Sequence, residues 1–247
     1  PQDPLVASLS LLAVLSLIVG AETVVDDETL IAGITAAFED MPALYIADGH
    51  HRSAAASRIA AARRKGDAEQ ASDYFLAVIF PQHQMKIMDY NRVVKDLNGL
   101  SADEFLAKIA HAYAVAPACG AVKPSCPGEV GLYLPGRWFR LNIDPKLFVA
   151  DPVARLDVSL LSEHLLGPIL GITDLRRDKR IDFVGGIRGL EELERRVDSG
   201  EMAVAFALYP SSLDQLMAVA DADEVMPPKS TWFEPKLADG LVSHVLD

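Results

Sequence analysis

A cluster of polar side chains directly follows an apolar run in the first quarter of the chain. The residues that follow the run 44–47 are Asp48-Gly49-His50-His51-Arg52-Ser53. A glycine turn lets backbone N–H groups come close to a ligand, and imidazole and guanidinium groups donate hydrogen bonds that suit phosphate oxygens. We therefore predict that Gly49–Ser53 bind the phosphates of a nucleotide. The alternative is a helix cap beside a buried, hydrogen-bonded histidine.

Two elements must meet at this turn to position those side chains. The apolar segment 43–47 predicts a buried strand, and the alanine-rich segment 53–64 predicts a helix. A helix N-terminus carries roughly half a positive charge, which favours a bound anion. The strand, the turn and the start of the helix together predict a compact phosphate-binding unit.

Asp48 stands where the predicted strand ends. A carboxylate there could hold a Mg²⁺ ion that bridges phosphates, or it could orient a histidine. The alternative is an N-cap of the helix that follows. We take Asp48 and His51 as the candidate catalytic residues and Asp48 as the candidate magnesium ligand. Two adjacent histidines are a poor metal pair, so we predict no structural zinc site.

Arg92, at the end of the predicted strand 85–94, is a second candidate phosphate ligand. The planar fork of its guanidinium group matches phosphate oxygens. The alternative is a surface salt bridge with Asp89 or Asp96.

The segment 226–237 is polar, aromatic and rich in proline, and it contains Lys229-Ser230-Thr231. It lacks the glycines of a P-loop. Because prolines restrict the unfolded chain, such a loop could hold Lys229, Ser230 and Thr231 toward a nucleotide. The alternative is a tail that is anchored by Trp232 and Phe233.

The rest of the chain alternates between helical and extended patterns. We expect helices over 26–40, 101–113, 157–169, 189–198 and 213–221, and strands over 74–80, 85–94, 129–143 with a hairpin turn at 135–136, 181–184 and 202–209. This interspersed pattern predicts an α/β or mixed α+β fold, with a mixed sheet and flanking helices.

The composition limits the partners that the protein can take. The chain has 247 residues, a net charge of −12 and a pI near 4.9. An acidic chain repels nucleic acid and anionic membranes, so we expect neither as a partner. Cys119 and Cys126 lack a zinc spacing, and we expect reduced thiols in a cytoplasmic protein.

The segment 5–20 is strongly apolar but lacks the basic start of a signal peptide. It is also short for a membrane span, which needs about 20 residues. We expect a buried helix or a pair of strands. Because the chain begins with Pro1 rather than Met, we also expect that sequence upstream is missing.

Three motifs together resemble a known group of proteins. They are 44–52, 182–186 and 226–237, with the sequences LYIADGHHR, DFVGG and MPPKSTWFEPKL. They resemble a bacterial and archaeal family related to the ParB/sulfiredoxin superfamily, whose better-understood relatives phosphorylate free L-serine with ATP or ADP. The resemblance covers about residues 24–247.

The resemblance implies a nucleotide-binding core in which Gly49–Arg52 bind phosphates and Asp48 has a metal or catalytic role. Similar sequences tend to have a His-Arg pair where this chain has Asn91-Arg92. Relatives also carry an acidic general base in a longer N-terminal region, and this chain does not visibly contain it. A sulfiredoxin-like activity would need a cysteine where His50 stands, and a DNA-partition protein would need a basic helix-turn-helix, so the kinase branch fits best.

We therefore expect residues 1–100 to form the phosphate-binding part and residues 101–247 to form a second α/β part that contributes the 226–237 loop. The expected function is a nucleotide-dependent kinase of a small hydroxyl metabolite, for which free serine is a candidate. It would use Mg²⁺ with ATP or ADP, and a homodimer is the assembly to test. The alternative is a nucleotide-binding regulatory protein without catalysis.

Overall fold

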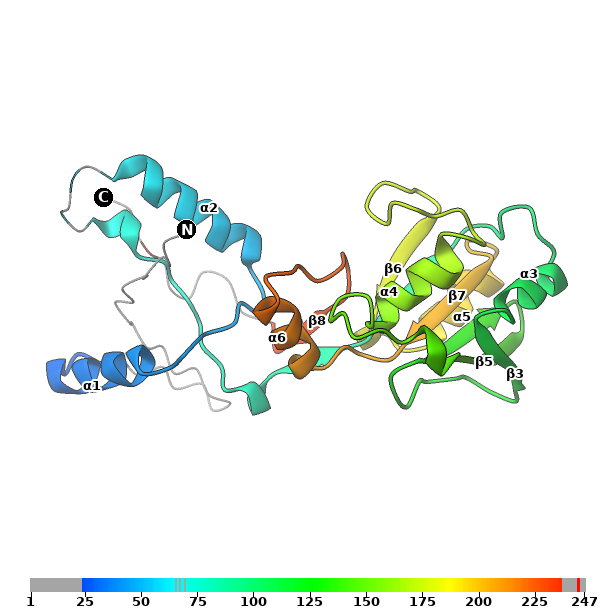
Figure 1. Cartoon of the computed structure of the whole chain (residues 1–247), viewed down its shortest axis with the longest axis horizontal. Coiled ribbons are helices and arrows are strands. Elements are labelled where there is room, and N and C mark those ends of the chain that lie inside the picture. Colours follow the sequence, from blue (N-terminus) through cyan, green and yellow to red (C-terminus); the bar gives the residue numbers. More distant parts are fainter. Residues whose placement is uncertain (1–23, 65, 67, 69, 237–243, 245–247) are drawn as a thin grey trace. The chain divides into compact units, whose positions relative to one another are not determined.

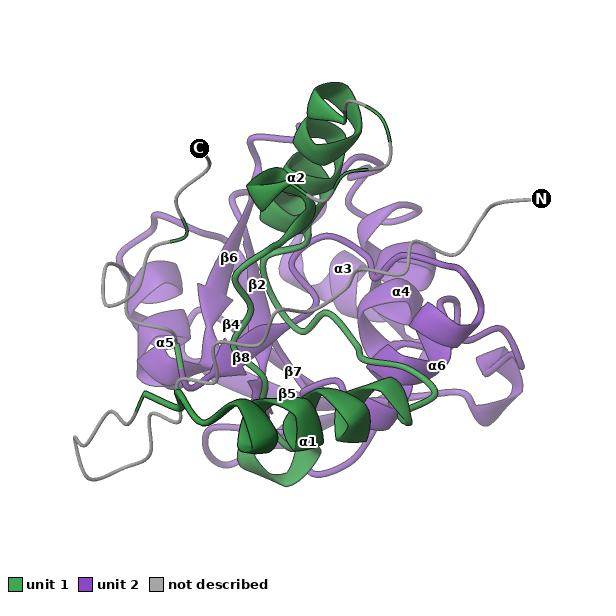
Figure 2. Cartoon of the chain, turned by 90° about the vertical axis from the view of Figure 1, so that its left-hand side faces the viewer, with its two compact units in different colours: residues 1–84, 236–247 green, residues 85–235 purple. Residues whose placement is uncertain are grey.

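The computed structural model describes residues 24–64, 66, 68, 70–236 and 244. The chain divides into two compact units, which Figure 2 shows in different colours. Unit 1 comprises residues 1–84 and 236–247, and unit 2 comprises residues 85–235.

Unit 1 is helical in its described part. Its elements are α1 (Glu28–Glu39), α2 (His50–Arg63) and the short 3-10 turns η1 (Ala71–Asp73) and η2 (Gln82–Gln84). Helix α1 begins two residues after the predicted start because Asp27 caps it, accepting the amide of Leu30 at 2.8 Å.

The strands predicted over 43–47 and 74–80 are wrong: neither segment belongs to a strand in the described structure. A strand needs a neighbour to satisfy its backbone groups, and the described part of unit 1 provides none for these segments. Several of their apolar side chains, among them Leu44, Ile46 and Phe75, are exposed. A short apolar run therefore signalled extended backbone but not a sheet.

Unit 2 contains the strands and the remaining helices (Figure 1). Its strands are β1 (Lys86–Met88), β2 (Tyr90–Val94), β3 (Tyr113–Ala118), β4 (Glu129–Leu134), β5 (Arg137–Ile143), β6 (Ile181–Gly185), β7 (Val204–Leu208) and β8 (Trp232–Glu234). Its helices are α3 (Ala102–Ile109), α4 (Asp157–Leu161), α5 (Glu191–Asp198) and α6 (Leu213–Asp221), with short turns at η3 (Pro145–Leu147), η4 (Ser162–Leu166) and η5 (Gly186–Arg188).

Six of these strands form one sheet in the order β3-β5-β4-β7-β2-β6, while β1 pairs with β8. Every pairing is antiparallel. The fold is therefore a combination of helices and strands, as predicted, but the sheet is antiparallel rather than mixed. The predicted hairpin is present, with Tyr133 of β4 opposite Trp138 of β5 across the turn at Gly136.

The two faces of the six-stranded sheet pack against different helices because side chains alternate along a strand. Val94 belongs to a core with Phe105 of α3 and Leu160 of α4. Its neighbour Val93 belongs to a second core with Leu193 of α5. Unit 2 thus has two apolar layers, one on each side of the sheet.

The predicted helix starts in unit 2 agree with the structure to within one residue, except that α5 begins at Glu191 rather than at Gly189. Ser101 forms a capping box with Glu104 at the start of α3, and Ser212 caps α6. The first of these helices ends at Ile109 rather than Tyr113, because Tyr113 opens β3. The helix predicted over 157–169 is α-helical only to Leu161 and continues as the π-helical turn η4.

None of the helices in the described ranges is long and apolar enough to cross a membrane. The predictions for the apolar segment 5–20 concern residues that lie outside the described part of the chain.

Candidate functional site

The turn before α2 is made by Gly49, which has φ +83° and ψ 18°. This left-handed conformation favours glycine. The helix begins at His50, three residues earlier than predicted, so His50, His51 and Arg52 form its first turn rather than the loop before it. Both histidines are exposed, and the alternative of a buried histidine is therefore wrong.

The N-terminus of α2 is left without a cap. No side chain in the described ranges caps it, and its first turn contains no acidic residue. The amides of Arg52 and Ser53 donate to the carbonyl of Gly49 at 2.9 and 3.0 Å. The amides of His50 and His51 have no hydrogen-bond partner among the described residues. Two free donors at the positive end of a helix suit a bound anion.

Arg52 folds back over this turn. A Cβ built on Gly49 would lie 3.1 Å from Nη2 of Arg52, so the guanidinium group rests directly above the glycine. Arg52 is exposed and forms no ion pair or hydrogen bond through its side chain within the described structure. The rings of His50 and His51 lie 4.3 Å apart. The turn thus collects free amides, imidazoles and a guanidinium group with unused donors.

Both carboxylate oxygens of Asp48 already contact neighbouring residues. Its Oδ1 accepts the amide of Gly49 at 2.7 Å, and its Oδ2 lies 3.6 Å from Nζ of Lys236. Asp48 is not the N-cap of α2, because that position belongs to Gly49. A Mg²⁺ ion bound to this carboxylate would have to displace Lys236, since the two cations repel each other. Among the described residues no three His, Cys, Asp or Glu side chains cluster as metal ligands.

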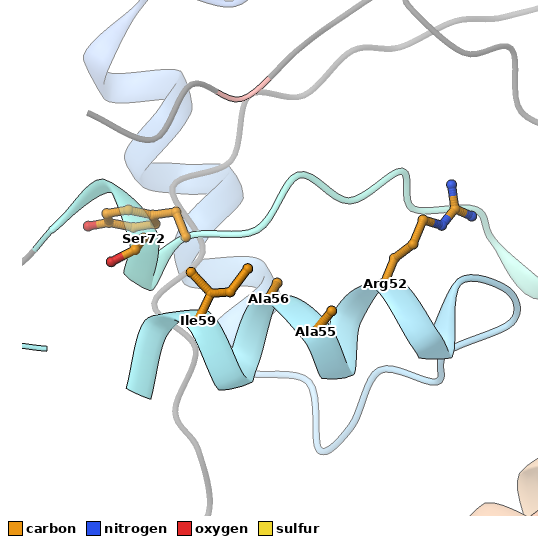
Figure 3. A pocket seen from close by; sticks show the side chains of 6 residues that line it. Arg52, Ala55, Ala56, Ile59 and Ser72 are labelled. Carbon is orange, nitrogen blue, oxygen red and sulfur yellow. The ribbon is translucent and has the colours of Figure 1, made fainter. Parts of the chain in front are cut away.

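A pocket of about 260 Å³ lies along α2, within unit 1 (Figure 3). The residues that line it are Arg52, Ala55, Ala56, Ile59, Ser72 and Tyr74. Sequence reasoning missed this pocket. The spacing of Arg52, Ala55, Ala56 and Ile59 is the signal that could have found one wall, because residues at i, i+3, i+4 and i+7 share a helix face.

Arg92 lies in unit 2, and its side chain is fully buried. Its Nη2 donates to the carbonyl of Lys229 at 3.0 Å and its Nη1 to the carbonyl of Tyr90, while its guanidinium carbon lies 5.5 Å from the ring centre of Phe183. Burial lowers the pKa of Arg92 to about 9. Its Nε is buried and has no hydrogen-bond partner within the part of the chain that the structure describes.

The alternative salt bridges of Arg92 with Asp89 or Asp96 do not form. Asp96 pairs instead with Arg180 at 3.4 Å, and Asp89 accepts the side-chain amide of Asn91 at 2.6 Å. Arg92 is therefore held by backbone carbonyls rather than by a carboxylate.

The loop that Arg92 supports carries Lys229, Ser230 and Thr231. Lys229 has φ +60°, which is left-handed, and its Nζ lies 5.9 Å from the ring centre of Tyr90. Ser230 is buried and donates its hydroxyl to the carbonyl of Pro227. The structure thus brings Arg92 and Lys229–Thr231 together in unit 2, whereas Asp48–Ser53 belong to unit 1.

The aromatic residues after this loop anchor it, as one alternative had expected. Phe233 is buried. The ring of Trp232 lies against Gly185, and a Cβ added to Gly185 would be only 2.6 Å from that ring. Gly186 has a similar close neighbour, because a Cβ on it would lie 2.2 Å from Oδ1 of Asp89. Both glycines of the 185–186 pair are therefore positions of close approach.

Comparisons with known proteins give one family and several distant structures. The sequence profile of a family described as "Protein of unknown function (DUF1015)" matches residues 21–159. No curated protein matches the chain.

The solved structures that resemble the chain include a free serine kinase in complex with AMP, at 16% identity and a TM-score of 0.42. A mutant of that kinase with AMP has a TM-score of 0.43. In both cases the similarity covers 76% of this chain and 66% of the kinase, so the chain spans slightly less than two thirds of the kinase's length. A conserved hypothetical protein from Pyrococcus furiosus is 17% identical over 76% of this chain and 68% of that protein, with a TM-score of 0.42.

Proposed function

This chain belongs to the family described as protein of unknown function DUF1015, and we propose that it is a nucleotide-dependent kinase of a small hydroxyl metabolite. The donor would be ATP or ADP, and free serine is the first acceptor to test. The observation that carries the proposal is the uncapped N-terminus of α2 with the unused donors of Arg52 above Gly49.

The free amides and the guanidinium group at this turn support the proposal because phosphoryl transfer needs groups that bind phosphate. The reaction depends mainly on positioning and on neutralising phosphate charge. In the proposed complex, the amides of His50 and His51 and the guanidinium group of Arg52 bind the phosphates, with Ser53 beside them. His51 stabilises the charge that develops on the transferred group. Asp48 orients the acceptor hydroxyl.

A Mg²⁺ ion that accompanies the nucleotide would neutralise part of the phosphate charge. As the alternative to orienting the acceptor, Asp48 is proposed as the protein ligand of this ion, and Lys236 would have to leave Oδ2 for the ion to bind. In unit 2, Lys229, Ser230 and Thr231 are proposed as further nucleotide-binding residues, and Arg92 as the residue that holds their loop.

The motifs at 44–52 and 226–237 also support our proposal that the chain is related to the ParB/sulfiredoxin superfamily. We propose no nucleic-acid partner because the chain carries a net charge of −12, and a cytoplasmic location because we expect Cys119 and Cys126 to be reduced thiols. A homodimer is the proposed assembly, to be tested by light scattering.

A second function, nucleotide binding without transfer, is favoured by one observation. The carboxylate of Asp48 is already engaged by the amide of Gly49 and by Lys236. If this carboxylate stays with the turn after the nucleotide has bound, the described site lacks a group that could take a proton from an acceptor. The protein would then respond to a nucleotide without using it.

The test of the phosphate site compares two arginine variants on the same helix. Arg52→Ala should weaken ATP or ADP binding by about 10- to 100-fold, the loss expected for a charge-assisted hydrogen bond. Arg58→Ala removes the same charge from another face of α2 and should change the affinity little. Calorimetric titration measures both, and equal affinities for the wild type and Arg52→Ala would reject the assignment.

Product analysis separates the two functions. The wild type is incubated with ATP or ADP and a panel of hydroxyl metabolites that includes L-serine. A phosphorylated product that disappears in Arg52→Ala supports the kinase. Nucleotide binding without any product supports the regulatory alternative.

A further inference from the structure

We infer that the pocket along α2 takes the nucleoside of the bound nucleotide, an inference that rests on the proposed phosphate site at Gly49–Arg52. The pocket has a volume of about 260 Å³ and belongs wholly to unit 1. Ligand pockets commonly start at about 300 Å³, so this one suits a small, flat group.

The wall of the pocket comes from one face of α2. Ala55 and Ala56 present only methyl groups, and Ile59 continues the apolar surface one turn further along the helix (Figure 3). Small side chains at the centre and a larger one at the end leave a shallow apolar trough. A nucleobase has two apolar faces that such a surface can cover.

The opposite wall supplies an aromatic ring and a hydroxyl group. Tyr74 lines the pocket, and aromatic rings stack on any nucleobase. Ser72 is 7% exposed, and its Oγ is buried without a hydrogen-bond partner among the described residues. An unpaired buried hydroxyl costs free energy. A hydroxyl can rotate to meet a partner, and the polar edge of a base would satisfy it.

Arg52 joins the pocket to the phosphate site. It lines the pocket and also rests above Gly49. From Arg52 to Ile59 the helix rises about 10 Å, a distance that one nucleoside diphosphate can bridge. Phosphates at the helix N-terminus would therefore place the nucleoside beside Ala55, Ala56 and Ile59.

The charges of the lining argue for a nucleoside rather than for the acceptor. Two of the described residues that line the pocket have an ionisable side chain: Arg52, which is cationic, and Tyr74, which has a phenol group. None of these lining residues has a carboxylate. The ammonium group of an amino acid would have no counter-charge there. A neutral nucleoside needs none.

The test compares ADP with inorganic pyrophosphate, which has phosphates but no nucleoside. The wild type should bind ADP at least tenfold more tightly than pyrophosphate. Ala56→Leu fills the trough while keeping a strong helix former, so it should weaken ADP binding at least tenfold and leave pyrophosphate binding unchanged. Ala54→Leu is the matched control, because residue 54 is exposed and lies about 200° around the helix from residue 56.

A second variant removes the hydroxyl without filling the pocket. Ser72→Ala should weaken ADP binding by about threefold to tenfold and leave pyrophosphate binding unchanged. Circular dichroism checks that every variant keeps its helices.

The outcomes separate the inference from the function on which it rests. The nucleoside pocket is refuted, while the phosphate site stands, if the wild type binds ADP and pyrophosphate with equal affinity and if Ala56→Leu and Ser72→Ala change both affinities equally. If the wild type binds neither compound, the proposed function fails and the inference fails with it.

Discussion

Two arginines that the sequence presents as equivalent phosphate ligands occupy opposite environments. Arg92 is fully buried in unit 2 and donates to the carbonyls of Tyr90 and Lys229. Arg52 is exposed in unit 1, at the uncapped start of α2, and its donors are unused in the described structure. Both are typical phosphate ligands by residue type. The two arginines differ in whether the described residues already supply hydrogen-bond acceptors for the guanidinium group.

The comparison shows how to separate a binding arginine from a supporting one. A donor that already binds a backbone carbonyl must break that bond before it can bind a ligand, whereas a free donor loses only water. Arg52 should therefore contribute mainly to ligand affinity, and Arg92 mainly to the stability of the fold. Each prediction below tests one side of this contrast.

The largest effect is expected from Arg92→Ala. The substitution leaves a cavity and two carbonyl groups without their donor, and each buried polar group that loses its partner typically costs about 1–3 kcal/mol. Urea unfolding followed by tryptophan fluorescence measures this loss of unfolding free energy, because both tryptophans, Trp138 and Trp232, lie in unit 2. Arg52→Ala is the control and should change the midpoint little. An unchanged midpoint for Arg92→Ala together with a lost affinity for pyrophosphate would reverse the roles of the two arginines.

The sequence allowed the turns and several helix starts to be predicted because these depend on neighbours in the chain. The glycine turn at Gly49 and the hairpin at Gly136 lie where they are predicted, and α3 and α6 begin within one residue of their predicted starts, where Ser101 and Ser212 cap them. Such features need only a few adjacent residues.

Burial was not predictable in the same way because it depends on distant partners. The environment of Arg92 is set by Lys229, which is 137 residues away in the sequence. The segments 43–47 and 74–80 have the composition of strands but find no strand partner among the described residues. Ser72 gave no sequence signal, because a serine becomes informative only when its hydroxyl is seen to be buried and unpaired.

A partly buried carboxyl group in unit 2, that of Asp157, predicts a pH dependence of stability. Burial raises the pKa of Asp157 to about 6, although the hydrogen bond from the amide of Gly128 at 2.9 Å acts in the opposite direction. Because the folded state holds this proton more tightly than the unfolded state, its contribution is fully present below about pH 4 and is lost as the pH rises through 6. The loss should be on the order of 3 kcal/mol at most.

The measurement compares urea midpoints at pH 4.5 and pH 7.5 for three proteins. Asp157→Asn should flatten the difference that the wild type shows. Asp223→Asn removes an exposed carboxylate and should leave the difference intact. If Asp157→Asn keeps the full pH dependence, another group causes it.

A smaller loss of stability should come from Gly185→Ala, which fills the space between β6 and the loop that Arg92 supports. In Gly185→Ala the new methyl group would lie 2.6 Å from the Trp232 ring, so the ring must shift. Overpacking of this kind costs about 1–3 kcal/mol, and the tryptophan emission should change with it. Gly120→Ala, where a Cβ meets no atom within 4 Å, is the control. Unchanged emission in Gly185→Ala would show that Trp232 does not lie on this glycine.

The smallest effect is expected at the turn that carries Arg52. Gly49→Ala places a side chain on a residue with φ +83° and brings its Cβ within 3.1 Å of Nη2 of Arg52. A left-handed alanine costs about 1 kcal/mol. The free turn can relieve this strain by leaving the binding geometry, and restoring that geometry should lower pyrophosphate affinity by up to about fivefold, while the unfolding of unit 2 stays unchanged. Gly66→Ala imposes the same kind of strain at φ +74° with no neighbouring atom within 4 Å, and it should leave the affinity intact. If both variants weaken binding equally, general strain in unit 1 explains the loss. If only Gly49→Ala does, the contact between this turn and Arg52 is part of the phosphate site, and the contrast with Arg92 becomes a contrast of function.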